Sequence, residues 1–247
     1  MGLFNLFKSK SGVGGEKRAN SAASKWADTA GNKRAQAYDR QEAIAELCKM
    51  GTAEAAEGLM RRFSFAIDPS ITDQEEKDAA FEGVVAAGHV AIEPVRAFVA
   101  KAESLAWPMR IMKELMTDDQ LVEEYITWLS RWDTEYSKFV DPKLQILAEL
   151  EEYEHPSIRE AVEPFLQDVN EPARFHAVAA TFAQRDPASI PLLVNALIDD
   201  ESVRVRIKIA DTFASLGWEI PADKRAAVRD ALPPQFDLVR SGKITKQ

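Results

Sequence analysis

The three histidines and the single cysteine are the residues of this 247-residue chain best suited to metal or nucleophilic chemistry. His89, His155 and His176 are too far apart for a helical metal motif, which needs ligands about three to five residues apart. Cys48 lies in an apolar pattern typical of a small core residue. We therefore expect no metal, no cofactor and no nucleophile activated by a neighbouring histidine.

Other residue types that carry chemistry also lack a catalytic arrangement. Acidic residues cluster at 123–124, 151–154 and 199–201, at the expected ends or solvent faces of helices, which indicates a hydrated surface. Gly12–Gly15 lacks both the preceding strand and the Lys-Ser/Thr continuation of a phosphate-binding loop. The sequence thus predicts a protein that is not an enzyme.

Charge is distributed unevenly along the chain. Residues 1–35 contain seven Lys or Arg and two acidic residues, so this arm carries +5 and the rest carries −14 of the net −9. An acidic body argues against DNA or RNA as the main ligand, because phosphate binding needs clustered cations. No apolar run approaches the roughly 18 residues that span a bilayer. We expect a cytoplasmic protein.

The pattern of apolar residues predicts helices from residue 36 onward. Apolar residues recur three and four apart, and strand-like alternation is absent. Regular breaks, among them Gly51, Gly88, Pro156 and Gly217, predict helices of about 10 to 15 residues, which must pack on neighbours to bury their apolar faces. Residues 1–35, rich in glycine, serine and lysine, are interpreted as a flexible basic arm.

An internal repeat is visible in the second half of the chain. Residues 180–183 (Ala-Thr-Phe-Ala) and 211–214 (Asp-Thr-Phe-Ala) are 31 residues apart. The segment Ile190–Gly217 resembles a HEAT repeat, with Pro191 opening a first helix and Val205 lying at the start of a second. The resemblance implies an all-α fold, a right-handed α-solenoid of about five antiparallel helix pairs.

In that family an aspartate and an arginine tie the turn of one repeat to the next, and Asp200 and Arg206 match those roles. We expect these two side chains near each other across the last turn between helices. The preceding segment has Phe175 where the arginine is expected. The repeat domain is assigned to residues 36–232, and residues 233–247 to a tail that forms either a small β-hairpin or a frayed end.

In a HEAT array the second helix of each pair lines the concave surface. The pattern of the last repeat, laid over the earlier ones, predicts outward-facing positions that form one ridge. These are Glu42, Glu46, Arg110, Glu114, Gln145, Glu149, Glu152, Thr181, Lys208 and Thr212. The ridge is acidic at its start and centre and mixed toward its end. It is either ordinary solvated charge or a groove for a protein or peptide carrying Lys or Arg.

Aromatic residues are densest between residues 107 and 139. Trp128 and Trp132 share a helical stripe with Tyr125, while a second apolar stripe includes Val122 and Leu129. Two stripes cannot both be wholly core on a surface helix. The cluster is therefore either core packing or an exposed binding patch.

The N-terminal tip combines large apolar residues with lysines. Its docking candidates are Leu3, Phe4, Leu6, Phe7 and Lys8. Three interpretations remain open: an extension of the first helix, docking on a protein, or weak contact of residues 1–10 with an anionic membrane surface on the inner side of the membrane.

These observations favour a non-enzymatic scaffold or adaptor that binds a protein or peptide on its concave face. One alternative is an enzyme of HEAT-like type, either a lyase or a DNA glycosylase for alkylated bases. Residues 132–133 (Trp-Asp) are superficially similar to the site of such glycosylases. The other alternative is a membrane-surface adaptor that uses the N-terminal arm.

Overall fold

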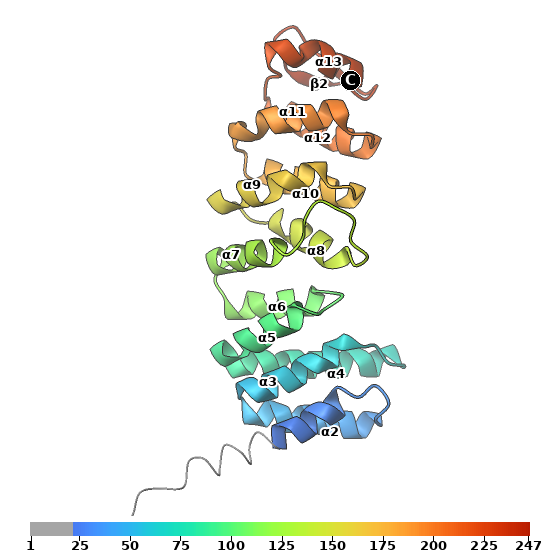
Figure 1. The fold of residues 1–247 in the computed structure, drawn as a ribbon, viewed down its shortest axis with the longest axis vertical. Coiled ribbons are helices and arrows are strands. Elements are labelled where there is room, and N and C mark those ends of the chain that lie inside the picture. Colours follow the sequence, from blue (N-terminus) through green and yellow to red (C-terminus); the bar gives the residue numbers. More distant parts are fainter. Residues whose placement is uncertain (1–21) are drawn as a thin grey trace, which may run out of the picture. The chain divides into compact units, whose positions relative to one another are not determined.

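The computed structural model describes residues 22–247, and most of these residues are helical (Figure 1). The prediction of an all-α fold is confirmed. The chain divides into two compact units at the junction of Met116 and Thr117. None of the described helices combines the length and apolar character needed to cross a bilayer. The docking candidates in residues 3–8 lie outside the described residues.

Unit 1, described over residues 22–116, is built from short helices joined by tight turns. They are α2 (Ala37–Met50), α3 (Ala53–Met60), η1 (Arg61–Ser64), α4 (Ser70–Ala87), η2 (Gly88–Ala91), α5 (Ile92–Val99) and α6 (Ala106–Leu115). Gly51 ends α2 with a φ of 58°, a conformation that costs glycine little. The Thr52 hydroxyl then accepts a hydrogen bond from the Ala55 amide and caps α3.

Helices that alternate along the chain pack side by side in unit 1. α2 contacts α4 and α4 contacts α6, while α3 contacts α5. Residues such as Ile44, Leu47, Val84 and Ile111 fill the space between these helices and are almost fully buried. The helices therefore form two layers, one of α2, α4 and α6 and one of α3 and α5. α4 and α6 are the second helices of the pairs α3–α4 and α5–α6, so the exposed side of the layer that contains α2, α4 and α6 is called the second-helix face.

The folded region of unit 1 begins earlier than the sequence analysis predicted. Residues 22–30 are helical, and Ala23, Ala27 and Ala30 are buried. Asp28 forms an ion pair with Arg61 at 2.9 Å. The assignment of a flexible arm as far as residue 35 is therefore wrong, because alanines at spacings of four and three allow close helix packing without a large apolar side chain.

Unit 2 (Thr117–Gln247) repeats this kind of packing. Its elements are α7 (Asp118–Leu129), α8 (Asp141–Leu150), α9 (Pro156–Val162), η3 (Glu163–Gln167), α10 (Glu171–Ala183), η4 (Pro187–Ser189), α11 (Ile190–Asp199), α12 (Val203–Leu216), η5 (Ala222–Lys224), α13 (Arg225–Ala231), β1 (Phe236–Leu238) and β2 (Ile244–Lys246). α10 contacts both α8 and α12, while α7 contacts α9 and α11 contacts α13. The exposed side of α8, α10 and α12 is the second-helix face of unit 2.

The C-terminal tail forms the β-hairpin that was one of its two predicted states. β1 pairs antiparallel with β2, and the Ile220 amide donates to the Gly242 carbonyl at 2.7 Å. Phe236, Leu238 and Ile244 point inward and are buried, and β2 contacts α12. The hairpin thus covers apolar surface at one side of α12.

A buried network of charges joins α2, η1 and α4 in unit 1. Glu76 accepts hydrogen bonds from Arg40 at 2.9 and 3.0 Å and from Arg62 at 2.7 Å. The side chains of Arg62 and Glu76 are 0% exposed. Asp73 extends the network, because it accepts hydrogen bonds from Arg62 and Lys77, each at 2.7 Å. The five groups thereby fix the turn between α3 and α4 against α2.

The Asp73 carboxylate makes the stability of unit 1 depend on pH. Burial alone would raise the pKa of Asp73, but hydrogen bonds from Lys77, Arg62 and the Ile67 amide outweigh it and hold the pKa below its ordinary value of 3.8. The folded pKa is depressed, so this stabilisation is complete above pH 3.8 and is lost as pH falls through the folded pKa.

We therefore expect Asp73→Asn to destabilise unit 1 at neutral pH, and the difference from the wild type to shrink as pH falls below 3.8. Hydrogen–deuterium exchange of α4 at a series of pH values measures this difference. Asp39→Asn, at an exposed aspartate of α2 outside the network, serves as the control. A constant difference across the series contradicts the assignment to Asp73.

A second set of charge pairs ties successive turns together in unit 2. Lys143 of α8 donates to Asp168 at 2.5 Å, and Arg174 of α10 donates to Asp200 at 2.7 and 3.0 Å. Arg206 of α12 is the next residue in this series after Lys143 and Arg174. Its Nη1 donates to the Ala231 carbonyl at 3.1 Å rather than to a carboxylate. We call this series the ladder.

The ladder corrects the predicted pairing within the last repeat. Asp200 pairs with Arg174 and not with Arg206. Asp168 and Asp200 each accept an amide two residues ahead, from Asn170 and Ser202. The turns that begin at Asp168 and Asp200 are 32 residues apart, whereas the sequence comparison used an offset of 31. With the offset of 32, Arg174 aligns with Arg206, so the repeat arginine of the earlier segment is Arg174 and not Phe175.

Candidate functional site

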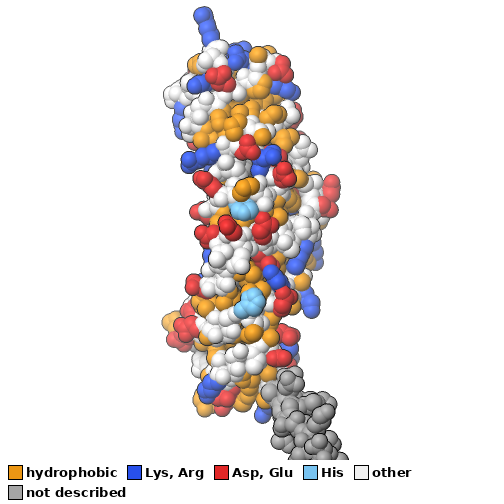
Figure 2. Space-filling model, turned by 90° about the vertical axis from the view of Figure 1, so that its left-hand side faces the viewer, with side chains coloured by type: hydrophobic (Ala, Val, Ile, Leu, Met, Phe, Trp, Pro, Cys, Tyr) orange, Lys and Arg blue, Asp and Glu red, His pale blue; other side chains and the backbone are white. Residues whose placement is uncertain are grey.

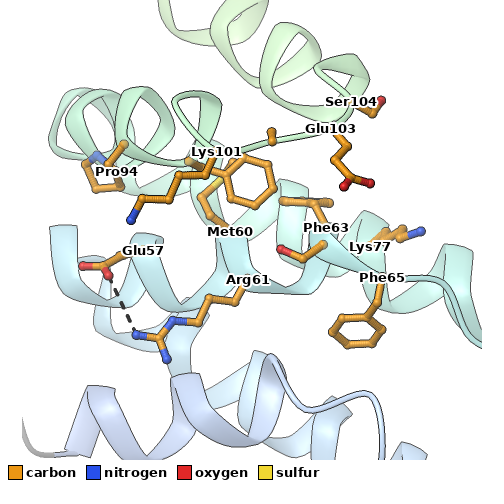
Figure 3. Close-up of a pocket in the computed structure, with 14 residues that line it drawn as sticks. Glu57, Met60, Arg61, Phe63, Phe65, Lys77, Pro94, Lys101, Glu103 and Ser104 are labelled. Atoms are coloured by element: carbon orange, nitrogen blue, oxygen red, sulfur yellow. Dashed lines mark ion pairs between the residues drawn. The ribbon is translucent and has the colours of Figure 1, made fainter. Parts of the chain in front are cut away.

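A cleft of about 740 Å³ opens in unit 1 between α3–η1 and α5. Met60 and Pro94 form buried parts of its floor, and Phe63, Phe65 and Phe98 are half-buried along its sides. The loop after α5 closes one end of the cleft with residues 101–104 (Figure 3). Apolar and charged side chains thus line the cleft in similar numbers.

Contacts behind the cleft hold its aromatic rings in place. Phe63 stacks on Trp107 with ring centroids 5.0 Å apart and planes inclined by 23°. The Arg110 guanidinium lies 4.4 Å from the Trp107 ring centroid. Phe65 lies 4.5 Å from the guanidinium of Arg62, which belongs to the buried network. The network and the stack therefore preform two walls of the cleft.

The charged groups of the cleft differ in how they are paired. Arg61 pairs with Asp28 at 2.9 Å and lies 3.8 Å from Glu57. Lys77 pairs with Asp73. Among the described residues, no carboxylate lies within ion-pair distance of Lys101, whose side chain extends across the cleft in front of Met60 (Figure 3). Lys101 is thus a cation available to a ligand.

The polar residues that line the cleft are serines, glutamates, lysines and one arginine, and neither histidine nor cysteine lines it. Among residues 22–247, no group of His, Cys, Asp and Glu side chains has the arrangement of a metal site. Sequence analysis missed this cleft, because its walls come from separate segments.

A second, shallower groove runs between α2 and α4 on the second-helix face of unit 1, with a volume of about 360 Å³. Ile44, Ala45, Cys48 and Ala79 line it together with Gln41, Glu75 and Glu76. Glu42 on α2 and Glu82 on α4 are exposed. The groove therefore has a partly apolar bottom, and its two lining carboxylates, Glu75 and Glu76, both belong to α4.

Two groups of α2 have shifted pKa values, Lys49 mainly because of a neighbouring carboxylate and Cys48 mainly because of burial. A hydrogen bond to Glu46, supported by the charges of Glu46 and Glu42, raises the pKa of Lys49. Burial raises the pKa of the Cys48 thiol, and the charge of Glu82 adds to this effect. Both directions are those that excess negative charge produces.

The structure leaves most of the predicted ridge accessible. Glu42, Arg110, Glu114 and Glu152 are exposed, and Glu46, Gln145, Glu149, Lys208 and Thr212 are half-buried. Thr181 is 0% exposed, so its predicted outward position is wrong. α10 is packed between α8 and α12, which covers a residue that would be exposed on an isolated helix pair. Figure 2 shows acidic and basic side chains intermixed on the face that it presents.

Trp128 belongs to the core and not to a binding patch. Its side chain is fully buried, and its Nε1 donates to the buried Glu124 carboxylate at 2.6 Å. The Tyr125 ring packs against it with centroids 5.5 Å apart. Burial, with a smaller contribution from the charge of Glu149, raises the pKa of the Tyr125 hydroxyl above its ordinary range. Trp132 is half-buried after the end of α7.

No protein-family model matches the chain, and no curated protein is significantly similar to it.

Proposed function

We propose that this protein is a non-enzymatic interaction module, an α-solenoid of HEAT type that binds a basic protein segment on the second-helix face of unit 1. The observation that carries the proposal is the groove between α2 and α4, two helices that both carry exposed glutamates, Glu42 on α2 and Glu75 and Glu82 on α4. Helical repeat proteins usually bind their partners on extended concave surfaces.

The arrangement of helices in each unit supports the repeat interpretation. In both units, alternate helices pack on one another, as in stacked helix pairs. Two ion pairs of the ladder each join a basic residue of one helix to an aspartate 25 or 26 residues further along the chain. The right-handed twist of the solenoid and its number of helix pairs, about five, are part of the proposal.

The charges beside the groove favour a partner rich in Lys or Arg. Glu42 and Glu82 are exposed and form no ion pair among the described residues, so both are available to cations of a partner. Complementary charge steers association and adds specificity more than affinity, and its effect decreases with salt.

Reversal of two exposed carboxylates, one on each of the helices that form the groove, tests the proposal. Fluorescence anisotropy with short labelled Lys/Arg-rich peptides should show saturable, salt-sensitive binding to the wild type. Glu42→Lys with Glu82→Lys should weaken it by about tenfold or more, because two attractions become repulsions.

The matched control is Glu54→Lys with Glu93→Lys, which changes the net charge equally at exposed residues of α3 and α5. Both variants should keep the helical content of the wild type, because the four residues are exposed. Equal weakening by the two pairs would attribute binding to net charge alone and contradict a site at the groove.

A further inference from the structure

We infer that the groove between α2 and α4 is also the docking site of this chain's own N-terminal tip (residues 3–10), which occupies it when no partner is bound. The tip reads Leu-Phe-Asn-Leu-Phe-Lys-Ser-Lys, four large apolar residues followed by two lysines, and it precedes the described part of the chain. The inference rests on the proposed function, because it makes the tip a competitor of the basic segment for the same groove.

Exposed apolar side chains extend the partly apolar bottom of the groove at one end. Tyr38 lies one helical turn before the first lining residue of α2, and Ile71 lies one turn before the first lining residue of α4. The two helices begin at the same end of the groove, because Arg40 of α2 pairs with Glu76 of α4 at 2.9 Å. Tyr38 and Ile71 are 73% and 71% exposed. The four apolar residues of the tip supply cover for this surface.

The net charge of the two helices favours a segment that also carries lysines. α2 and α4 contain eight carboxylates and three cations, and Arg62 of the buried network adds a fourth cation from η1. Four negative charges therefore remain in excess after the paired groups are counted. Glu42 and Glu82 are exposed and form no ion pair among the described residues. Lys8 and Lys10 follow the apolar residues of the tip directly, so one short segment supplies both apolar contact and opposite charge.

The chain between the tip and unit 1 is long enough to reach the groove. The helix of residues 22–30 is fixed in unit 1, where Asp28 pairs with Arg61 at 2.9 Å. Residues 11–21 connect this helix to the tip and span up to about 40 Å when extended. α2, with 14 residues, is only about 21 Å long. Because both partners belong to one chain, even a weak contact between them is populated.

The single cysteine of the chain reports whether the groove is occupied, because Cys48 lines it. Alkylation of the folded full chain with a maleimide, followed by mass spectrometry, should be about threefold or more faster in Phe4→Ser with Phe7→Ser than in the wild type, since the open groove is then more populated. The matched control is Asn5→Ser with Val13→Ser, which keeps the four apolar residues and should react like the wild type. Faster alkylation accompanied by loss of helical content would come from opening of unit 1 and would overturn the inference.

Charge reversal separates docking of the tip from general attraction between the basic segment and the acidic helices. Lys8→Glu with Lys10→Glu should accelerate alkylation of Cys48, because both charges then oppose the excess of glutamates. Lys17→Glu with Arg18→Glu changes the net charge equally outside the tip and should have little effect. Equal acceleration by the two pairs contradicts a contact made by residues 3–10.

Peptide binding distinguishes this inference from the proposed function. The labelled Lys/Arg-rich peptides should bind Phe4→Ser with Phe7→Ser about threefold or more tightly than the wild type, because their competitor is removed. Unchanged alkylation and unchanged peptide affinity in this variant overturn the inference and leave the proposed function intact. Faster alkylation with no peptide binding to either protein supports the contact of the tip and contradicts the proposed function. Protection of Cys48 that increases with protein concentration assigns the tip to a second copy and overturns docking within one chain.

Discussion

Replacing Glu76 by alanine is expected to destabilise unit 1 by about 3–5 kcal/mol, the usual cost of removing one partner from a buried ion pair. Glu76 accepts hydrogen bonds from both Arg40 and Arg62, and its side chain is 0% exposed. Without it, two arginines remain buried near each other with less compensating negative charge. Urea unfolding and hydrogen–deuterium exchange of residues 22–116 measure the effect.

The neighbouring glutamate supplies the matched control. Glu75 is exposed on the same helix, so Glu75→Ala should change the free energy of unfolding by about 0.5 kcal/mol or less. Exchange in the core of unit 2 should not respond to either substitution. Equal stabilities of the two variants would show that the arginines are solvated without Glu76, which contradicts the buried network.

Replacing Asp168 by alanine is expected to have a similarly large effect in unit 2, about 3–5 kcal/mol. Asp168 is paired with Lys143, and the side chains of both are at most 1% exposed. The remaining partner of the Lys143 ammonium would be the Asp133 carbonyl, at 3.1 Å. Urea unfolding followed by exchange of α8 and α10 measures the loss.

The end of the ladder provides the comparison for this prediction. Arg206 has the Ala231 carbonyl where Lys143 and Arg174 have carboxylates. Arg206→Met should therefore cost less, about 1.5–3 kcal/mol, a typical value for a hydrogen bond to a charged group. Combining Lys143→Met with Asp168→Ala should restore part of the stability lost in Asp168→Ala alone, because no buried charge is then left unpaired. If Arg206→Met were as costly as Asp168→Ala, the carboxylates would not be the source of the stability.

Local backbone chemistry is what made the helices predictable. Gly51 and Gly217 end α2 and α12 with φ values of 58° and 65°, a region that glycine enters readily. Pro156 and Pro187 each begin a helical element at the predicted breaks. These signals depend on one or two residues, so they are visible in the sequence without knowledge of the packing.

Tertiary packing determines which side chains are buried at the positions where the sequence left burial open or predicted it wrongly. Trp128 is buried because α7 contacts both α8 and α9, so that both of its apolar stripes face other helices. Thr181 is covered because α10 lies against α8 and α12. The cleft in unit 1 combines residues of α3, η1, α4 and α5, so no single stretch of sequence carries a signal for it.

The spacing of the ladder has an evolutionary consequence. Asp168 and Asp200 are 32 residues apart, as are Arg174 and Arg206, and each aspartate begins the same kind of turn. Deletion of the codons for residues 169–200 would join Asp168 directly to Glu201. Asp168 would then stand in the place of Asp200: it would keep its ion pair with Lys143 and accept the hydrogen bond of the Ser202 amide. Duplication of the same codons would be equally in register. Chain length can therefore change in steps of one helix pair while the hairpin remains at the end.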